Sequence, residues 1–327
     1  MTDMISFTDI SNFINSEISK VDWIKEPVGL YEPISYTMTQ GGKRVRPALM
    51  LMAYNLYRDD IEKIINPAIG IEVFHNFTLL HDDIMDKASI RRGKPTVHLK
   101  WDENTAILSG DVMQILAYEY ISDVPAQYLK EVLKLFTKTA AEICEGQQYD
   151  MEFESRVDVN PDEYLEMIRL KTAVLLGCSL QIGAILGGSS QKDAESLYAF
   201  GVNLGLAFQL KDDILDVYGE EATFGKQIGG DIFSNKKTFL LIHAKNRAKD
   251  DILKNLEFWL NKENPDRESK INEVTKIYNQ LEVKNICEEA MNSYYKKAIA
   301  KIDLVNVSQI KKQELRKLAE KLLHRNE

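Results

Sequence analysis

Residues 79–86 read LLHDDIMD, and residues 208–216 read FQLKDDILD. Each stretch holds an Asp-Asp-x-x-Asp cluster in an apolar, helix-like run, so its three carboxylates fall within an arc of roughly 100° on the helix surface. Like charges crowded on one helix face are destabilising unless a cation compensates them. Carboxylate oxygens suit a hard divalent ion, and Mg²⁺ completes its coordination with water and substrate phosphate. Two such clusters facing each other would hold a phosphorylated ligand between them.

Outside the two clusters, apolar positions recur every three or four residues, and sustained period-two alternation is nearly absent. Glycine pairs and prolines divide the chain into stretches of about 15 to 30 residues, the length of helices in a large bundle. We therefore predict an all-α fold. No low-complexity linker separates the clusters, so we expect a single domain over residues 1–327 whose halves close around one site.

Composition limits the function further. The chain has 327 residues, of which 44% are hydrophobic, so it can bury a substantial core. The net charge is −9 and no basic stripe is sustained, which argues against nucleic-acid binding. Cys144, Cys178 and Cys287 are far apart and show no C-x-x-C spacing. They predict buried thiols in a reducing compartment, and hence a cytoplasmic protein.

No membrane or export segment is expected. The most hydrophobic stretch, residues 172–188, is short for a membrane span and contains Ser179 and Gln181, which favours a helix buried within the protein. Near the amino terminus, Asp9 and Glu17 interrupt the apolar stretches, so no signal sequence is predicted.

The first cluster is predicted to lie near the end of its helix. Arg91 and Arg92 follow it, and Gly93 and Pro95 stop the helix. The carboxylates would then lie at the negative end of the helix dipole, which favours cations. The arginines could place donors on phosphate oxygens that metals leave uncovered. A solvated, charged helix end is the alternative for one such cluster, and the second copy makes this alternative less favoured.

Residues 41–47 read GGKRVRP, a flexible turn with three cations before an expected helix start. Cationic side chains and free backbone N–H groups at a helix start can bind an anion. Such a loop is often only surface structure. Beside the aspartate clusters, however, it would provide a second anion pocket that needs no metal.

These motifs, in their order and spacing, resemble those of the all-trans isoprenyl diphosphate synthases, or polyprenyl synthetases. The resemblance covers nearly the whole chain and includes EGQ at residues 145–147, GGD at residues 229–231 and KKT at residues 236–238. It implies a single all-α bundle of the isoprenoid synthase type around a central cavity, and a homodimer. It also implies a short-chain trans-prenyltransferase that joins isopentenyl diphosphate head to tail (1'-4) to an allylic diphosphate and releases diphosphate.

The resemblance also implies roles for individual residues. About three Mg²⁺ ions per active site would bridge the allylic diphosphate. The metal ligands would be Asp82, Asp86 and Asp212, supported by Asp83, Asp213 and Asp216. The cations on the same diphosphate would be Arg91, Lys171, Lys226 and Lys236. Isopentenyl diphosphate would be held without metal by Lys43, Arg46, His75 and Arg92, with Arg44 in the same basic shell. The residues lining the reacting centre would be Thr172 and Gln209.

The implied chemistry follows from where charge develops. Ionising the allylic C–O bond places negative charge on the departing diphosphate, so divalent ions and cationic side chains around it lower the barrier. The isopentenyl double bond then attacks the allyl cation, and the released diphosphate is the base that removes the proton. Water would trap the cation as an alcohol, so an apolar pocket is expected below the metals.

The floor of that pocket is expected one and two turns before the first cluster. Thr78 lies four residues before Asp82, and Phe77 and Phe74 flank the same region. In the family, the residues four and five before the first aspartate limit product length, and Phe77 resembles short-chain enzymes. Ordinary core packing is the alternative for both aromatics.

We expect the C20 product geranylgeranyl diphosphate, with C15 farnesyl diphosphate next. The first cluster lacks the two-residue insertion of the family's bacterial farnesyl enzymes. Thr78 is not the paired aromatic of the eukaryotic farnesyl enzymes.

Two other functions remain open. A class I terpene cyclase also ionises a prenyl diphosphate through Asp-Asp-x-x-Asp, but it usually replaces the second cluster and needs no isopentenyl pocket. A non-catalytic helical subunit would be expected to lose aspartates, whereas all six are present here.

Two further motifs carry less weight. Glu72 and His75 form the Glu-x-x-His pattern of di-iron bundles, but the sequence has no second copy. The basic residues from 311 to 325 favour a solvated amphipathic helix, and a tail that covers the isopentenyl site is a lesser possibility.

Overall fold

A computed structural model describes residues 4–219 and 228–323, and the chain forms two compact units. Unit 1 comprises Met1–Thr137, Cys178–Tyr198 and Val305–Leu315, and unit 2 comprises Lys138–Gly177, Ala199–Leu304 and Arg316–Glu327. Each unit is therefore assembled from segments that are distant in the chain. The expectation of a single domain over residues 1–327 stays a prediction.

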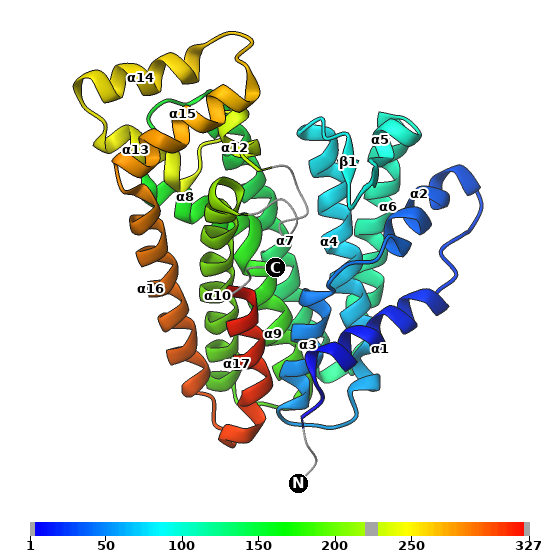
Figure 1. Cartoon of the computed structure of the whole chain (residues 1–327). Coiled ribbons are helices and arrows are strands. Elements are labelled where there is room, and N and C mark those ends of the chain that lie inside the picture. The colour runs from blue at the N-terminus through cyan, green and yellow to red at the C-terminus, as the bar shows by residue number, and fades with distance from the viewer. Residues whose placement is uncertain (1–3, 220–227, 324–327) are drawn as a thin grey trace. The chain divides into compact units, whose positions relative to one another are not determined.

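The described residues are almost entirely helical, which confirms the all-α class (Figure 1). The helices of unit 1 are α1 (Phe7–Lys20), α2 (Val28–Thr39), α3 (Val45–Asn55), η1 (Ile61–Ile64), α4 (Ile65–Met85), α5 (Val97–Lys100) and α6 (Glu103–Ser122). The helices of unit 2 are α8 (Pro161–Ile168), the π-helical turn η2 (Arg169–Ala173), α12 (Gly230–Phe233), α13 (Phe239–Arg247), α14 (Asp250–Asn261), α15 (Arg267–Gln280) and α16 (Val283–Asp303). The helices with residues in both units are α7 (Ala126–Ser155), α9 (Val174–Gly187), α10 (Gln191–Tyr218) and α17 (Gln309–Leu323).

A short hairpin follows the first aspartate cluster. Strands β1 (Ile90–Arg91) and β2 (Lys94–Pro95) pair antiparallel, with Arg92 and Gly93 between them at φ 52° and 74°. The sequence predicted a helix stop at Gly93 and Pro95, but the helix already ends at Met85. The left-handed backbone at Gly93 is what glycine supplies readily, and it closes the turn that carries both arginines.

The core of unit 1 is built around α3, in which every residue from Pro47 to Asn55 is buried. A side chain added at Gly183 on α9 would place its Cβ 2.1 Å from the carbonyl oxygen of Met50, so this glycine lets the two backbones approach closely. Beside α3, helices α4 and α6 run next to each other (Figure 1). Because α4 is buried along most of its length, its aspartate-bearing end is held by a rigid support.

The core of unit 2 gathers apolar side chains from α8, α10, α13, α15 and α16. Helix α8 begins with a complete capping box, because Asn160 accepts from the backbone of Glu163 and the Glu163 side chain accepts from the Asn160 backbone. Thr238 caps α13 by accepting from the backbone N–H of Leu241. These caps fix the two helix starts that lie next to the second aspartate cluster.

Three lesser expectations can be compared with the structure. The continuous helical segment Pro161–Gly187 is long and apolar enough to cross a membrane by length and composition, but 78% of its most apolar window is buried inside the protein, as expected for a core helix. Cys178 and Cys287 are buried, whereas the expectation of burial is wrong for Cys144, which is exposed on α7. Helix α17 is amphipathic as predicted, because Leu315, Leu318 and Leu322 are buried whereas Gln313, Lys317 and Glu320 are exposed.

Candidate functional site

The aspartates 82, 83 and 86 occupy the last turn of α4, which confirms the predicted place of the first cluster near its helix end. Asp82 is half-buried, Asp83 is buried and Asp86 is exposed at the C-cap. The helix dipole places partial negative charge at this end, so the carboxylates and the last carbonyl groups together favour a cation. The three aspartates therefore differ in how accessible they are to a ligand.

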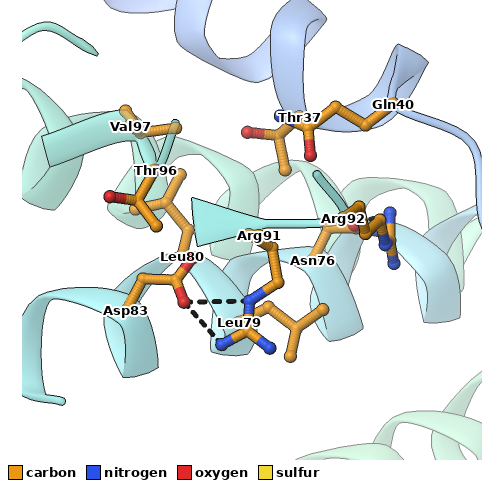
Figure 2. A pocket seen from close by; sticks show the side chains of 10 residues that line it. All are labelled: Thr37, Gln40, Asn76, Leu79, Leu80, Asp83, Arg91, Arg92, Thr96 and Val97. Carbon is orange, nitrogen blue, oxygen red and sulfur yellow. Dashed lines mark hydrogen bonds and ion pairs between the residues drawn. The ribbon is translucent and has the colours of Figure 1, made fainter. Parts of the chain in front are cut away.

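Asp83 is engaged by the protein. Its Oδ1 accepts from Nε of Arg91 at 2.9 Å and also from Nη2 of the same guanidinium (Figure 2). Burial raises the pKa of Asp83, although the bond to Arg91 opposes this shift. Arg91, which the family resemblance assigns to the allylic diphosphate, thus joins hairpin strand β1 to the end of α4.

The two hairpin arginines help to line a small cavity (Figure 2). Its lining residues come from α2, α4, the hairpin and the start of α5: Thr37, Gln40, Asn76, Leu79, Leu80, Asp83, Arg91, Arg92, Thr96 and Val97. The cavity measures about 20 Å³, which is room for about one water molecule. It is a packing gap next to the arginines, and it is too small to hold a prenyl chain.

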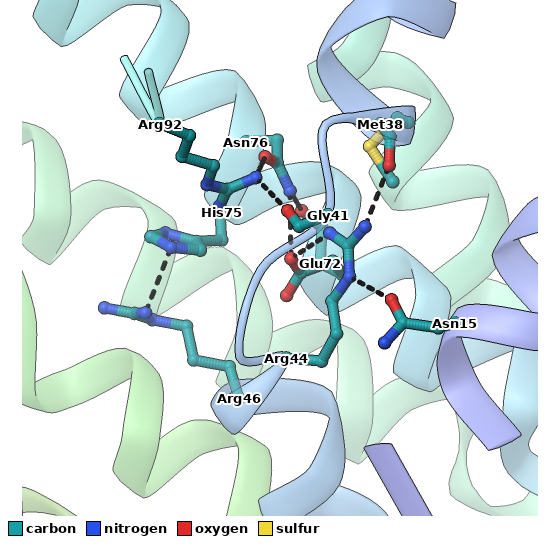
Figure 3. Close-up of polar contacts among 9 residues, drawn as sticks. All are labelled: Asn15, Met38, Gly41, Arg44, Arg46, Glu72, His75, Asn76 and Arg92. Carbon is teal, nitrogen blue, oxygen red and sulfur yellow. Dashed lines mark hydrogen bonds and ion pairs between the residues drawn. The ribbon is translucent and has the colours of Figure 1, made fainter. Parts of the chain in front are cut away.

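Two of the cations expected to bind isopentenyl diphosphate, Arg46 and Arg92, lie close to His75 on α4. Nη1 of Arg46 lies 3.1 Å from Nε2 of His75 (Figure 3). Burial and the neighbouring Arg46 and Arg92 hold the pKa of His75 well below 6.5, so the imidazole is neutral at physiological pH. Burial also lowers the pKa of Arg46 to about 10, which still leaves it charged. Lys43 is exposed on the preceding loop. We call Lys43, Arg46, His75 and Arg92 the basic cluster.

Arg44 is placed differently from the other cations of the same motif. It is 4% exposed, and its Nη1 donates to Oε1 of Glu72 at 2.6 Å. The resemblance grouped Arg44 with the substrate-binding residues, whereas the structure directs its guanidinium into the protein. Glu72, which the sequence left as half of a discounted di-iron pattern, is its partner.

The residues proposed as a pocket floor lie side by side on α4. The rings of Phe74 and Phe77 are 5.5 Å apart, and Phe74 also meets Phe136 edge to face at 5.1 Å. Phe74 is 1% exposed and Phe77 is 8% exposed, so both rings are buried in the core. Thr78 is half-buried, and its hydroxyl donates to the backbone oxygen of His75. The role of Phe77 and Thr78 in product length stays a prediction.

His81, next to the first cluster, has a structural role. Its Nε2 lies 3.1 Å from the carbonyl oxygen of Ile107, and its ring meets Phe77 edge to face at 4.8 Å. A side chain at Gly110 would collide with the His81 ring, at 2.2 Å from Nε2. The half-buried histidine therefore joins α4 to α6 through its hydrogen bond and its ring contact.

The second cluster lies on α10 in unit 2, where Asp212 is half-buried and Asp213 and Asp216 are buried. Oδ2 of Asp213 accepts from the hydroxyl of Tyr164 at 2.6 Å and from the backbone N–H of Phe239 at 3.3 Å. Burial raises the pKa of Asp213 to about 7, with Asp231 adding to the effect. Asp213, like Asp83, is therefore a structural member of its cluster.

Asp216 organises the segment that follows the cluster. Its Oδ2 accepts from the backbone N–H of Asp231 at 3.0 Å, and its backbone oxygen accepts from Gly229 at 2.6 Å. Gly229 adopts the left-handed φ of 74° at the start of α12. The predicted residue Lys226 lies outside the described residues.

Two of the predicted diphosphate-binding lysines share a carboxylate that the sequence did not single out. Oδ2 of Asp150 lies 2.7 Å from Nζ of Lys171 and 4.0 Å from Nζ of Lys236. Burial raises the pKa of Asp150, but Lys236 and Lys171 together lower it below its usual value. Asp150 is one helical turn beyond Gln147 of the quoted EGQ motif, and this spacing was the available signal.

Lys171 and Thr172 lie in the π-helical turn η2. Oγ1 of Thr172 is 3.5 Å from Oε1 of Gln209, so the two residues predicted at the reacting centre do meet. A Cβ at Gly146 would lie 2.3 Å from the backbone nitrogen of Lys171, and one at Gly205 would lie 2.6 Å from Cα of Ala173. Because Gly146 and Gly205 have no side chain, α7 and α10 can pack closely against the turn that carries Lys171 and Thr172.

Comparison with known proteins extends these observations. A family model described as polyprenyl synthetase matches residues 27–280. A geranylgeranyl diphosphate synthase of Methanosarcina mazei is 41% identical over 247 residues, covering 75% of this chain and 76% of the relative. Another, of Sulfolobus acidocaldarius, is 37% identical over 327 residues, covering 98% and 97%. A crystal structure of a geranylgeranyl pyrophosphate synthase has a TM-score of 0.93 at 44% identity, covering 98% of this chain and 99% of that one.

Proposed function

Because this chain belongs to the polyprenyl synthetase family, we propose that it is a short-chain trans-prenyltransferase that condenses isopentenyl diphosphate with an allylic diphosphate. The product is geranylgeranyl diphosphate, the C20 compound named for relatives that share nearly the full length of this chain. The reaction joins the substrates head to tail and releases diphosphate.

The basic cluster of unit 1 is the observation that carries this proposal. Arg46 and Arg92 lie next to a neutral His75, and Lys43 is exposed on the loop that precedes α3. The carboxylate of Asp83 is directed to Arg91, not to this cluster. A second diphosphate can therefore bind here through cationic donors, without metal. A terpene cyclase, which ionises one diphosphate substrate, has no use for such a pocket.

The aspartates fit a Mg²⁺-dependent reaction. Asp82 and Asp86 present hard carboxylate oxygens one helical turn apart, and Asp212 is their half-buried counterpart on α10. Among residues 4–219 and 228–323, no three His, Cys, Asp or Glu side chains are already gathered as a metal site. A few carboxylates that are not gathered into a complete metal site suit Mg²⁺, because this ion takes one or two carboxylates and fills its other positions with water and phosphate. Bound Mg²⁺ would supply electrophilic stabilisation of the departing diphosphate.

The other residues act on the diphosphate and the allyl group. Lys171 and Lys236 are proposed to place positive charge on the leaving diphosphate, with Asp150 holding both lysines in position. Thr172 and Gln209 would orient the reacting carbon, because they meet at the π turn. No protein nucleophile is needed. The released diphosphate removes a proton from the carbon next to the cation formed by condensation, and the electron pair of that C–H bond becomes the new double bond.

Product length is proposed to depend on Phe77 and Thr78. Phe77 is almost fully buried one turn below the aspartates and packs against His81 and Phe74. A bulky ring at this depth would stop the growing chain once it reaches α4. Farnesyl diphosphate is the second candidate product.

We further propose that the protein is a cytoplasmic homodimer. Helix α6 exposes Ile107, Leu108 and Ile115, at 42%, 57% and 66%. A second copy of this chain would cover these apolar side chains, in line with the family resemblance. None of the cysteines Cys144, Cys178 and Cys287 forms a disulfide, which suits a reducing compartment.

The test is to incubate the pure protein with isopentenyl diphosphate, Mg²⁺ and each allylic primer in turn, and to measure the length of the prenyl product. Formation of C20 diphosphate is the expected result. A cyclic hydrocarbon formed from the allylic substrate alone would support a terpene cyclase instead. Absence of turnover with every primer would support a non-catalytic subunit.

A further inference from the structure

Arg44 uses all three guanidinium nitrogens on protein atoms (Figure 3). Nε donates to Oδ1 of Asn15 at 2.9 Å, Nη1 donates to Oε1 of Glu72 at 2.6 Å, and Nη2 donates to the carbonyl oxygen of Met38 at 2.8 Å. Its partners lie on α1, α4 and α2. Arg44 and Glu72 are 4% and 2% exposed, so the ion pair is shielded from solvent. A guanidinium held in this way does not reach a substrate.

The backbone at Arg44 is also unusual. Its φ of 47° is left-handed, and it precedes the first turn of α3. An arginine in this conformation carries a steric cost that the surrounding contacts must offset. The three side-chain bonds of Arg44 provide that offset, so the side chain determines how the loop enters α3.

A second set of bonds holds the beginning of the same loop. The amide of Asn76 donates to Oε1 of Glu72 at 3.1 Å, and its Oδ1 accepts from Nη1 of Arg92 at 3.2 Å. The same Nη1 donates to the carbonyl oxygen of Gly41 at 2.6 Å. Bonds therefore run from Glu72 in two directions, to Arg44 at one end of the loop and through Asn76 and Arg92 to Gly41 at the other (Figure 3).

Glu72 also lies at the centre of the charged side chains of this region, as it does of the hydrogen bonds. Arg44, Arg46 and Arg92 would repel one another, and Glu72 supplies a buried negative charge among them. Burial lowers the pKa of both Arg46 and Arg92, and the negative charge of Glu72 opposes this shift, so Glu72 stabilises the charged forms of both arginines. The cations can thus be assembled before any diphosphate arrives.

We propose that Arg44 and Glu72 are positioning residues for the isopentenyl diphosphate site, which fix the loop at residues 41–44 and the guanidinium of Arg92 without contacting substrate. This inference rests on the proposed function, in which the basic cluster binds isopentenyl diphosphate. Ordering the loop in advance removes an entropic cost that would otherwise be paid on binding. The pair therefore sets affinity for isopentenyl diphosphate and not for the allylic substrate.

The decisive variant replaces both members, Arg44→Met with Glu72→Met. Removing one member alone would leave an unpaired buried charge and could unfold the protein, whereas apolar residues of similar size can replace a buried ion pair with little loss of stability. The double variant should therefore keep its circular dichroism spectrum and a similar melting temperature, but lose the bonds that hold the loop.

Calorimetric titration with isopentenyl diphosphate alone measures binding without turnover. We expect the Kd of the double variant to rise about tenfold, the cost of ordering one or two side chains on binding. The KM for the allylic diphosphate should stay within about twofold. Arg44→Lys keeps the positive charge next to Glu72 but lacks the planar set of donors of arginine. Its Kd for isopentenyl diphosphate should therefore lie between those of the unmodified protein and the double variant. Arg58→Met is the matched control, because Arg58 forms an exposed pair with Asp60 in the same unit.

Three outcomes would overturn the inference. An unchanged Kd for isopentenyl diphosphate in a folded double variant would reduce the pair to a structural contact. Equal losses for both substrates would indicate general damage. If the double variant does not fold, Asn76→Ala is the alternative, because it keeps the ion pair and removes only the hydrogen bonds that connect Glu72 to Arg92. A Kd for isopentenyl diphosphate within error of that of the unmodified protein would then overturn the inference. If the unmodified protein binds isopentenyl diphosphate but forms no product, the proposed function fails separately.

Discussion

At the residue scale, the first and second aspartates of both clusters differ in burial in the same way. The second aspartate of each is buried and bonded to the protein, Asp83 to Arg91 and Asp213 to Tyr164. The first aspartate of each is half-buried. Burial thus separates carboxylates that the spacing alone treats as equal. It leaves Asp82 and Asp212 more exposed than Asp83 and Asp213, which fits the role as metal ligands that we propose for them.

Replacing Asp82 or Asp212 by alanine is expected to lower kcat/KM at least about a thousandfold, because each variant loses a carboxylate that we propose as a ligand of Mg²⁺ at the leaving group. Steady-state kinetics at saturating Mg²⁺ measure the effect. Asp111→Ala, an exposed aspartate on α6, is the matched control and should keep full activity. Near-normal rates in either test variant would contradict the assigned roles.

Phe77→Ala is expected to lengthen the product by at least one isoprene unit, because it removes a ring one turn below Asp82. The cavity should also cost about 3 kcal/mol of stability. Chromatography of the dephosphorylated products measures their length. Ile18→Ala, a buried change on α1, should cost stability without lengthening the product. An unchanged chain length would reassign Phe77 to the core.

His75 predicts a pH dependence of stability. Its pKa is held well below 6.5 in the folded protein, by burial first and then by Arg46 and Arg92. The unfolded chain takes up a proton near pH 6.5 while the folded state does not, so the free energy of unfolding falls as the pH drops below 6.5. Between pH 7.5 and 5.5, urea denaturation should show a loss about 1 kcal/mol larger than that of His75→Gln. Equal losses in the two proteins would argue against a buried neutral imidazole.

At the element scale, the π-helical turn positions Lys171 and Thr172, two of the proposed site residues. Residues 169–173 widen the helix between α8 and α9, and this turn carries Lys171 and Thr172. Gly146 and Gly205 allow α7 and α10 to approach the turn at both ends. The glycines therefore matter for the geometry of the site more than for local backbone freedom.

Gly146→Ala is expected to displace the π turn, because the added Cβ would lie 2.3 Å from the backbone nitrogen of Lys171. Overpacking of this kind costs about 1 to 3 kcal/mol. The KM for the allylic diphosphate should rise, while the Kd for isopentenyl diphosphate should change little. Gly29→Ala has open space around the new Cβ and serves as the control. A Gly146→Ala protein with normal stability and kinetics would show that α7 and the turn can separate freely.

At the scale of the whole molecule, each unit carries one aspartate cluster and its own cations. Unit 1 adds the basic cluster, and unit 2 adds Asp150 with its two lysines. Both units contain segments from distant parts of the chain, so neither corresponds to a continuous half of the sequence. The proposed second copy would lie against α6 of unit 1.

Leu108→Asp combined with Ile115→Asp is expected to convert a dimer into a monomer, because two buried charges would oppose the proposed contact. Light scattering coupled to size-exclusion chromatography measures the mass. Phe258→Asp on α14, where the ring is 55% exposed, is the control and should remain dimeric. An unmodified protein that is monomeric at working concentration would refute the dimer.

The sequence by itself determined the helical class, the two aspartate clusters, the basic loop and the family, because periodicity and motif spacing are local properties of the chain. Only the tertiary structure decided which members of these motifs face the protein. Arg44 pairs with Glu72, which is 28 residues away in the sequence, and Asp213 bonds to Tyr164, which is 49 residues away. Burial and the choice of a partner depend on packing between helices that spacing does not encode, so the roles of Arg44, Glu72, Asp83 and Asp150 became visible only in the folded chain.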